Sequence, residues 1–184
     1  MSFLYTQIHH TLLRLATGIT IVIILPLLFS CKHSAPSQTD QHERISLDSL
    51  AATYTSVDSL RLLQKKMERE GNTTGSMIVQ RHIGNLLRLD NHFSQALQIH
   101  SDCQSRAQAA NDKLEWIQAT NEIGTDYRRV CIFCMALQYH YRALMTSNSY
   151  ADTSYIARKC KAAALNGLGN AYLALHNYSQ ADSL

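Results

Sequence analysis

One residue pattern occurs three times along this chain of 184 residues, and it limits the possible folds more than any other feature. In each copy a glycine is followed after three residues by a leucine or tyrosine, then by an aromatic residue and an alanine. The copies are Gln80, Ile83, Gly84, Leu87, Phe93 and Ala96; Thr120, Ile123, Gly124, Tyr127, Phe133 and Ala136; and Leu165, Leu168, Gly169, Tyr172, Tyr178 and Ala181. The glycines are 40 residues (124 − 84) and 45 residues (169 − 124) apart, a self-similarity typical of repeat proteins.

The spacing within each copy predicts two antiparallel helices. The glycine of each copy follows an apolar residue and precedes a leucine or tyrosine by three residues, so it lies where a second helix can approach closely. The alanine, nine residues after that leucine or tyrosine, allows the same close approach from the second helix. Turn-forming residues separate the halves at 90–92 and 176–177, and residues 129–132 separate them in the middle copy. Both prolines precede residue 40, so no proline interrupts these helices.

This pattern resembles the tetratricopeptide repeat. The three glycines match the small residue of that family's first helix, the three alanines match that of its second, and Cys103 and Ala143 occupy the later small position. The period exceeds the family's roughly 34 residues, no copy has tryptophan at the first aromatic position, and no proline closes a repeat. The resemblance implies an all-α fold, a right-handed α-solenoid of antiparallel helix pairs, with an array over 76–184 divided at about 76–111, 112–150 and 153–184.

Both ends of the array depart from a full repeat. Residues 57–72 align without a gap with 96–111, so 44–75 is interpreted as a degenerate leading repeat or as amphipathic cap helices. The last repeat stops at Leu184, soon after its second helix starts at Tyr178, and two helical turns do not hold together alone. Terminal repeats usually carry a capping helix. We therefore expect a fragment or the front of a longer array, with a frayed or partner-completed helix as the alternative.

The start of the chain predicts a secretory signal peptide over 1–30. Residues 15–29 carry no charge and follow Arg14, and this run is short of the roughly 20 apolar residues of a membrane-spanning helix. The tetrapeptide Leu28-Phe29-Ser30-Cys31 resembles the lipobox of bacterial lipoproteins. That resemblance implies cleavage before Cys31 and acylation of Cys31, which would attach the protein to a membrane. An unmodified Cys31 after an ordinary signal is the alternative.

Small polar residues after Cys31 predict a flexible tether over 31–43. By the lipoprotein resemblance, an aspartate directly after the acylated cysteine would indicate retention in the inner membrane, and Lys32 stands there instead. We therefore expect an outer-membrane anchor with the protein facing the periplasm.

The chain offers few candidates for chemistry. Cys131 and Cys134 flank Phe133 at a turn, which favours packing over a disulfide or a metal site, while Cys103 and Cys160 are expected to be small buried residues. His100 and His140 stand at the same position of two successive repeats. We expect both to pack in the core, in preference to binding zinc as a pair of ligands.

No catalytic motif of the common hydrolase, zinc-protease or nucleotide-binding kinds occurs in the mature chain, so we expect no enzyme, no catalytic residue, no cofactor and no metal. The net charge of +3 is mild, with scattered basic residues, so we expect no nucleic-acid partner.

A binding surface remains. In the tetratricopeptide family the first helices of successive repeats line a concave groove, which here implies a peptide-binding set of Arg81, Asn85, Arg88, Asn121, Thr125, Arg128, Asn166 and Asn170. Arginines and amides favour a peptide with carboxylate groups. Part of the family's carboxylate clamp is matched, but its later positions hold Glu122, Ala163 and Gly167, so the clamp is incomplete. Solvated arginines and asparagines bonded to nearby backbone are the alternative.

Two functions fit these features. The first is a lipid-anchored scaffold of the bacterial cell envelope that binds a protein or peptide without catalysis. The second is the extracytoplasmic sensor portion of a longer signalling protein with a histidine kinase or helix-turn-helix output. A metal or redox protein built on Cys131 and Cys134 is a remote third. The sequence does not identify the partner.

Overall fold

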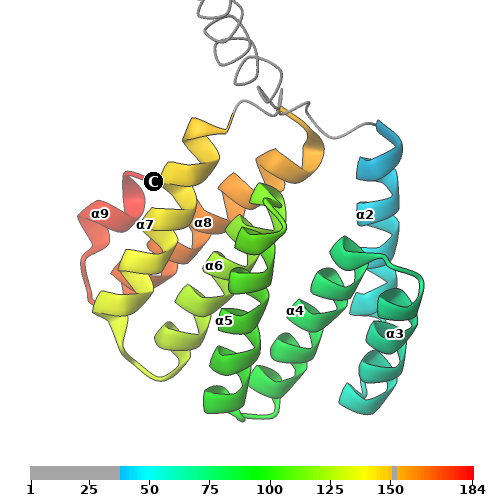
Figure 1. The fold of residues 1–184 in the computed structure, drawn as a ribbon. Helices are drawn as coiled ribbons and strands as arrows, with labels where there is room; N and C mark the ends of the chain where they lie inside the picture. Colours follow the sequence, from blue (N-terminus) through cyan, green and yellow to red (C-terminus); the bar gives the residue numbers. More distant parts are fainter. Residues whose placement is uncertain (1–37, 151–152) are drawn as a thin grey trace, which may run out of the picture. The chain divides into compact units, whose positions relative to one another are not determined.

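The computed structural model describes residues 38–150 and 153–184, and over these residues the chain is helical with no strand (Figure 1). The all-α prediction is therefore confirmed for this part of the chain. The predicted signal peptide, Cys31 and the first seven residues of the predicted tether, 31–37, lie outside the described residues.

The described helices follow one another with short connections. They are α2 (Gln38–Ala52), α3 (Val57–Arg69), α4 (Thr73–Leu89), α5 (Phe93–Ala109), α6 (Lys113–Arg129), α7 (Phe133–Ser149), α8 (Tyr155–Ala174) and α9 (Tyr178–Asp182). The two predicted repeats at 76–111 and 112–150 correspond to the pairs α4–α5 and α6–α7, and the third segment corresponds to α8 with the short α9.

Five of the turns between the described helices share one backbone conformation. Each of these five contains one residue with a positive φ of 55° to 71°, the conformation that ends a helix, namely Gly71, Asn91, Asn111, Cys131 and His176. At three of these turns the next residue caps the following helix with its side chain, since Asn72, Asp112 and Asn177 accept from backbone N–H groups. These local signals set where α4, α6 and α9 begin.

The helices form two layers (Figure 1). In the first layer α2 contacts α4, α4 contacts α6, and α6 contacts α8. In the second layer α5 packs against both α4 and α6, and α7 packs against both α6 and α8. Helices α5 and α7 therefore each join two first-layer helices, which places first-layer side chains of successive pairs next to one another.

The core is built from the residues of the repeated pattern. Ile83 and Ala96 belong to one buried cluster with Leu60 of α3 and Val79 of α4. Further along, Ala143 of α7 packs with Leu114, Ile117, Ile156, Cys160 and Ala164. Burial of such side chains supplies most of the stabilisation of the stacked helices, at about 25 cal/mol per Å² of apolar surface.

Helix α2 corrects part of the tether prediction. It begins at Gln38, so the last six residues of the predicted tether, 38–43, are helical. Tertiary contacts hold the middle of this helix: Glu43 accepts a hydrogen bond from Asn72, and Arg44 donates to Asp112 at 2.6 Å. The small polar composition of this segment gave no sign of these distant partners.

Among the described residues, no helix has the length and apolar character needed to cross a membrane.

Candidate functional site: the polar face of the first-layer helices

A glycine and a histidine meet in the same way in two successive helix pairs. A Cβ atom on Gly84 would lie 2.3 Å from Nε2 of His100, and a Cβ atom on Gly124 would lie 2.8 Å from the ring of His140. Both histidines are buried, with exposed fractions of 0% and 1%. The prediction that His100 and His140 are core residues is confirmed, and glycine is required because the ring occupies the space of a side chain.

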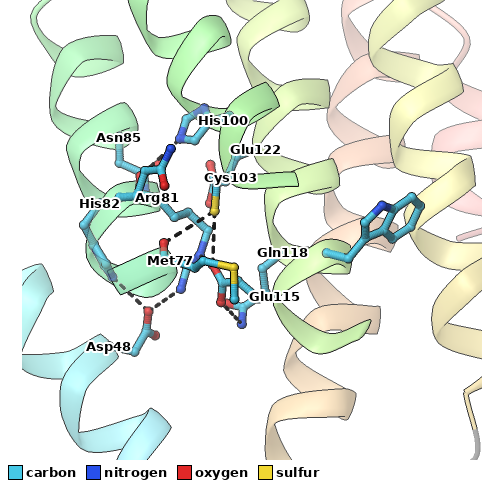
Figure 2. Close-up of polar contacts among 12 residues, drawn as sticks. Asp48, Met77, Arg81, His82, Asn85, His100, Cys103, Glu115, Gln118 and Glu122 are labelled. Atoms are coloured by element: carbon cyan, nitrogen blue, oxygen red, sulfur yellow. Dashed lines mark hydrogen bonds and ion pairs between the residues drawn. The ribbon is translucent and has the colours of Figure 1, made fainter. Parts of the chain in front are cut away.

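A network of charged side chains connects the first-layer helices (Figure 2). Arg81 of α4 donates from Nη2 to Asp48 of α2 at 2.7 Å and from Nε to Glu115 of α6 at 2.8 Å. The same Asp48 carboxylate contacts Nε2 of His82 at 2.8 Å and Nζ of Lys159, on α8, at 2.9 Å. Arg81 and Glu115 are buried, so this network is part of the interior.

The electrostatics of this network favour the charged forms. Burial raises the pKa of Asp48, but the hydrogen bond with His82 and the charge of Arg81 outweigh it and hold the pKa well below its usual range. Burial lowers the pKa of Arg81, and the carboxylates of Glu115 and Asp48 outweigh that effect, so its pKa is raised. The buried arginine thus stays protonated between two carboxylates.

A second network lies about two turns further along α4. Arg88 donates to Glu122 at 2.7 Å, to Asp126 at 2.9 Å and to Asn85 at 2.7 Å. Asp126 also contacts Nδ1 of His100 at 2.6 Å. Burial raises the pKa of Glu122, but the charges of Arg88 and His100 lower it overall. The His100–Asp126 pair is enclosed, since Asp126 has an exposed fraction of 1%.

The corresponding histidine of the next pair has weaker partners. Nδ1 of His140 lies 3.2 Å from Oδ1 of Asn121, whose Nδ2 donates to the backbone oxygen of Cys160 at 3.2 Å. Nε2 of His140 is buried and has no hydrogen-bond partner in the described part of the chain. Burial, followed by the charge of Arg128, lowers the pKa of His140 to about 4, so the ring is neutral at pH 7.

The eight residues predicted to line a groove therefore differ in accessibility. Arg81 and Asn121 are buried, and Arg88 is paired with carboxylates. Thr125 donates to the backbone oxygen of its own helix, and the other half-buried or exposed members are Asn85, Arg128, Asn166 and Asn170. The surface left for a partner lies towards α6 and α8.

Sequence reasoning missed the acidic partners in these networks, Asp48, Glu115 and Asp126. Two of them lie one repeat after the arginine they bind, since 34 residues separate Glu115 from Arg81 and 38 separate Asp126 from Arg88. An acid at nearly the repeat period from an arginine is a signal that could have identified these two. The 33 residues between Asp48 and Arg81 run back into α2, which lacks the pattern.

The other pattern residues differ in burial. Ala96 and Ala136 have exposed fractions of 0%, whereas Ala181 and Gly169 are half-buried. Two aromatic positions contact rings of α7. Tyr127 stacks on Tyr139 with centroids 5.5 Å apart, and the hydroxyl of Tyr172 lies 2.7 Å from that of Tyr141.

The packing interpretation of Cys131 and Cys134 is wrong, because both thiols are exposed and free. Cys131 occupies the positive-φ position of its turn, and Cys134 lies on the solvent side of the first turn of α7, so only Phe133 between them is partly buried. Cys103 and Cys160 are buried, as predicted. No group of three or more His, Cys, Asp or Glu residues within 38–150 and 153–184 is placed to hold a metal ion.

Comparison with known proteins found neither a matching family model nor a matching curated protein.

Proposed function

We propose that this protein is a non-catalytic scaffold, a right-handed tetratricopeptide-like solenoid anchored by an acylated Cys31 in the bacterial cell envelope, facing the periplasm. It binds a protein or peptide through the face formed by its first-layer helices. The observation that carries the proposal is the recurring contact of a first-layer glycine with a second-layer histidine, at Gly84–His100 and again at Gly124–His140. Such recurrence is a property of stacked repeats, whose extended surfaces serve binding.

Burial of the histidine–carboxylate pair supports a role without catalysis. His100 and Asp126 are 2.6 Å apart, a geometry that can serve proton transfer, but their exposed fractions of 0% and 1% leave no approach for a substrate. The pair instead joins α5 to α6 and positions the first-layer face. Polar side chains that a partner can reach on that face include Asn166 and Asn170 of α8.

Site-specific photocrosslinking in the native cell envelope tests the proposal. A benzoylphenylalanine replaces Asn166, which is exposed on α8, or Gln138, which is exposed on the second-layer helix α7 as the matched control. We expect a discrete crosslinked product from position 166 and none from position 138, because only the first-layer face binds the partner.

Equal products from both positions, or no product from position 166 and from a second probe at position 170, would contradict a partner on the first-layer face.

A further inference from the structure

The contacts of α4 with α6 and those of α6 with α8 can be compared position by position. Arg81 contacts Glu115, and Asn121, 40 residues after Arg81, contacts Cys160, 45 residues after Glu115. The second-layer histidines follow the same register, since the rings of His100 and His140 lie on Gly84 and Gly124. A position in α6 therefore corresponds to the position 45 residues later in α8.

This correspondence defines what surrounds two equivalent arginines. Arg88 and Arg128 are 40 residues apart and both lie in the last turn of a first-layer helix. Arg88 donates to Asn85, Glu122 and Asp126. The equivalent positions around Arg128, 40 residues after Asn85 and 45 residues after Glu122 and Asp126, are Thr125, Gly167 and Ala171. The amide and both carboxylates that hold Arg88 are absent around Arg128.

The charge and hydrogen bonding of Arg128 and His140 are consistent with the absence of carboxylates at these equivalent positions. Arg128 is half-buried and forms no ion pair with any residue of 38–150 or 153–184. Burial, together with the charges of Arg129 and Arg88, lowers its pKa, so its positive charge is held unfavourably. The nearby His140 is buried with Nε2 unpaired, whereas both ring nitrogens of His100 have partners at 2.6 and 3.1 Å.

We propose that Arg128 is the anchor of a carboxylate-binding subsite, at which a glutamate or aspartate side chain of a peptide partner takes the place that the Glu122 carboxylate holds on Arg88. The inference rests on the proposed binding function and adds the class of ligand and the residue that recognises it. A planar guanidinium binds a carboxylate through two parallel hydrogen bonds, which gives orientation as well as affinity. Gly167, at the position equivalent to Glu122, has no side chain that could bind Arg128. A larger residue is excluded there because the ring of His140 would lie 2.3 Å from its Cβ atom.

In the test, the full chain is labelled with ¹⁵N in its arginines, kept in detergent and titrated with N-acetylated tetraglutamate amide. Binding is followed by the NMR shifts of the arginine side chains. We expect saturable shifts at the Arg128 side chain, and no saturation with tetraglutamine amide or inorganic phosphate. Arg128→Gln weakens tetraglutamate binding on the order of tenfold or more, because a charge-assisted pair is lost. Arg129→Gln, the neighbouring exposed cation, changes it less than about twofold.

A second variant keeps the test valid if Arg128→Gln alters folding. Arg128→Lys retains the charge and loses the two parallel bonds, so its affinity is expected to fall between wild type and Arg128→Gln. Equal losses in Arg128→Gln and Arg129→Gln would mean diffuse charge attraction and would overturn the subsite. Phosphate binding as tight as tetraglutamate would overturn the peptide assignment.

The two proposals fail separately. A crosslinked partner at position 166 whose yield is unchanged in Arg128→Gln removes the subsite and leaves the scaffold. Specific tetraglutamate binding at Arg128 without any crosslinked partner removes the scaffold function and leaves the subsite.

Discussion

Nζ of Lys159 in α8 lies 2.9 Å from Oδ2 of Asp48 in α2, although 111 residues separate the two along the chain. The other oxygen of the same carboxylate contacts Arg81 and His82 of α4. One side chain of the first described helix thus connects α2, α4 and α8. Asp48 also forms an ion pair with Arg81, the residue that the family resemblance assigned to the peptide groove.

Asp48→Asn should destabilise the protein by about 1–3 kcal/mol in urea unfolding at pH 7, because buried Arg81 and half-buried His82 lose a charged acceptor. Lys159→Gln should cost less than about 1 kcal/mol, since Lys159 is 55% exposed. Asp102→Asn, at an exposed aspartate of α5, is the control and should change little.

The Asp48 effect should also depend on pH. Because folding lowers the pKa of Asp48, its stabilisation is present above the unfolded value near 4 and is lost as the pH falls towards the folded value. The difference in stability between wild type and Asp48→Asn should therefore begin to shrink below about pH 4 and continue to shrink as the pH falls further. A constant gap from pH 7 to pH 2 would show that charge is not the cause.

His140 should contribute a separate pH dependence. Its pKa is lowered to about 4 in the folded protein, while an unfolded histidine titrates near 6.5, so the unfolded state binds more protons between these values. The stability should be complete above about pH 6.5 and fall by about 3 kcal/mol as the pH reaches 4. His140→Asn should flatten this slope, and His92→Asn, at an exposed position, should keep it. Identical slopes in all three proteins would contradict the lowered pKa.

Two glycines should respond in opposite directions to alanine. Gly84→Ala should destabilise by about 1–3 kcal/mol, because the new Cβ would lie 2.3 Å from His100, which is bonded on both nitrogens. Gly169→Ala should stabilise by about 0.5–1 kcal/mol, since nothing lies within 4 Å of its Cβ and alanine favours a helix. Denaturant unfolding measures both, and a loss of stability in Gly169→Ala would show that this position is in fact crowded.

Cys131→Asn should stabilise the protein by about 0.5–1 kcal/mol. Cys131 has φ 62°, and the equivalent turns have asparagine at 91 and 111, the residue that adopts this conformation with least strain after glycine. Cys134→Ser, at an exposed helical position without a positive φ, should leave the thermal midpoint nearly unchanged. If both substitutions shift the midpoint equally, the backbone conformation is not the reason.

The lipoprotein resemblance predicts an acylated Cys31. Intact mass measurement of the protein from its native membranes should give a species that begins at Cys31 and carries added acyl chains. Cys31→Ser should remove the added mass and release the protein from the membrane fraction, because stable attachment needs more than one buried chain. A wild-type species without added mass would remove the anchor from the proposed function.

Several features of the fold were predictable because they are local. Gly84 and Gly124 at helical spacing indicated where helices touch, and the turn formers at Asn91 and His176 indicated where helices end. The same expectation was wrong at Gly169, where nothing lies within 4 Å of a Cβ atom. The burial of His100 and His140 followed from their equivalent positions in the pattern. Each of these properties depends on neighbours within one helix pair, whose separation the sequence records directly.

The polar face was predicted less well. Arg81 and Arg88 were assigned to a ligand, and the structure pairs both with carboxylates from neighbouring helices. The extension of α2 to Gln38 and the exposure of Cys131 were also missed. The sequence shows that a residue is charged or small, but it does not show which group of a distant helix that residue contacts.

The sequence by itself determined the helical class of the described residues, the period of the pattern and the positions where helices approach closely, because helix spacing and turn conformation depend on residues near in the chain. Only the tertiary structure decided that, among the described residues, Arg81 and Arg88 are paired with carboxylates while the equivalent Arg128 is not. That outcome depends on packing between α2, α4, α6 and α8, where pairs such as Asp48 and Lys159 meet across 111 residues.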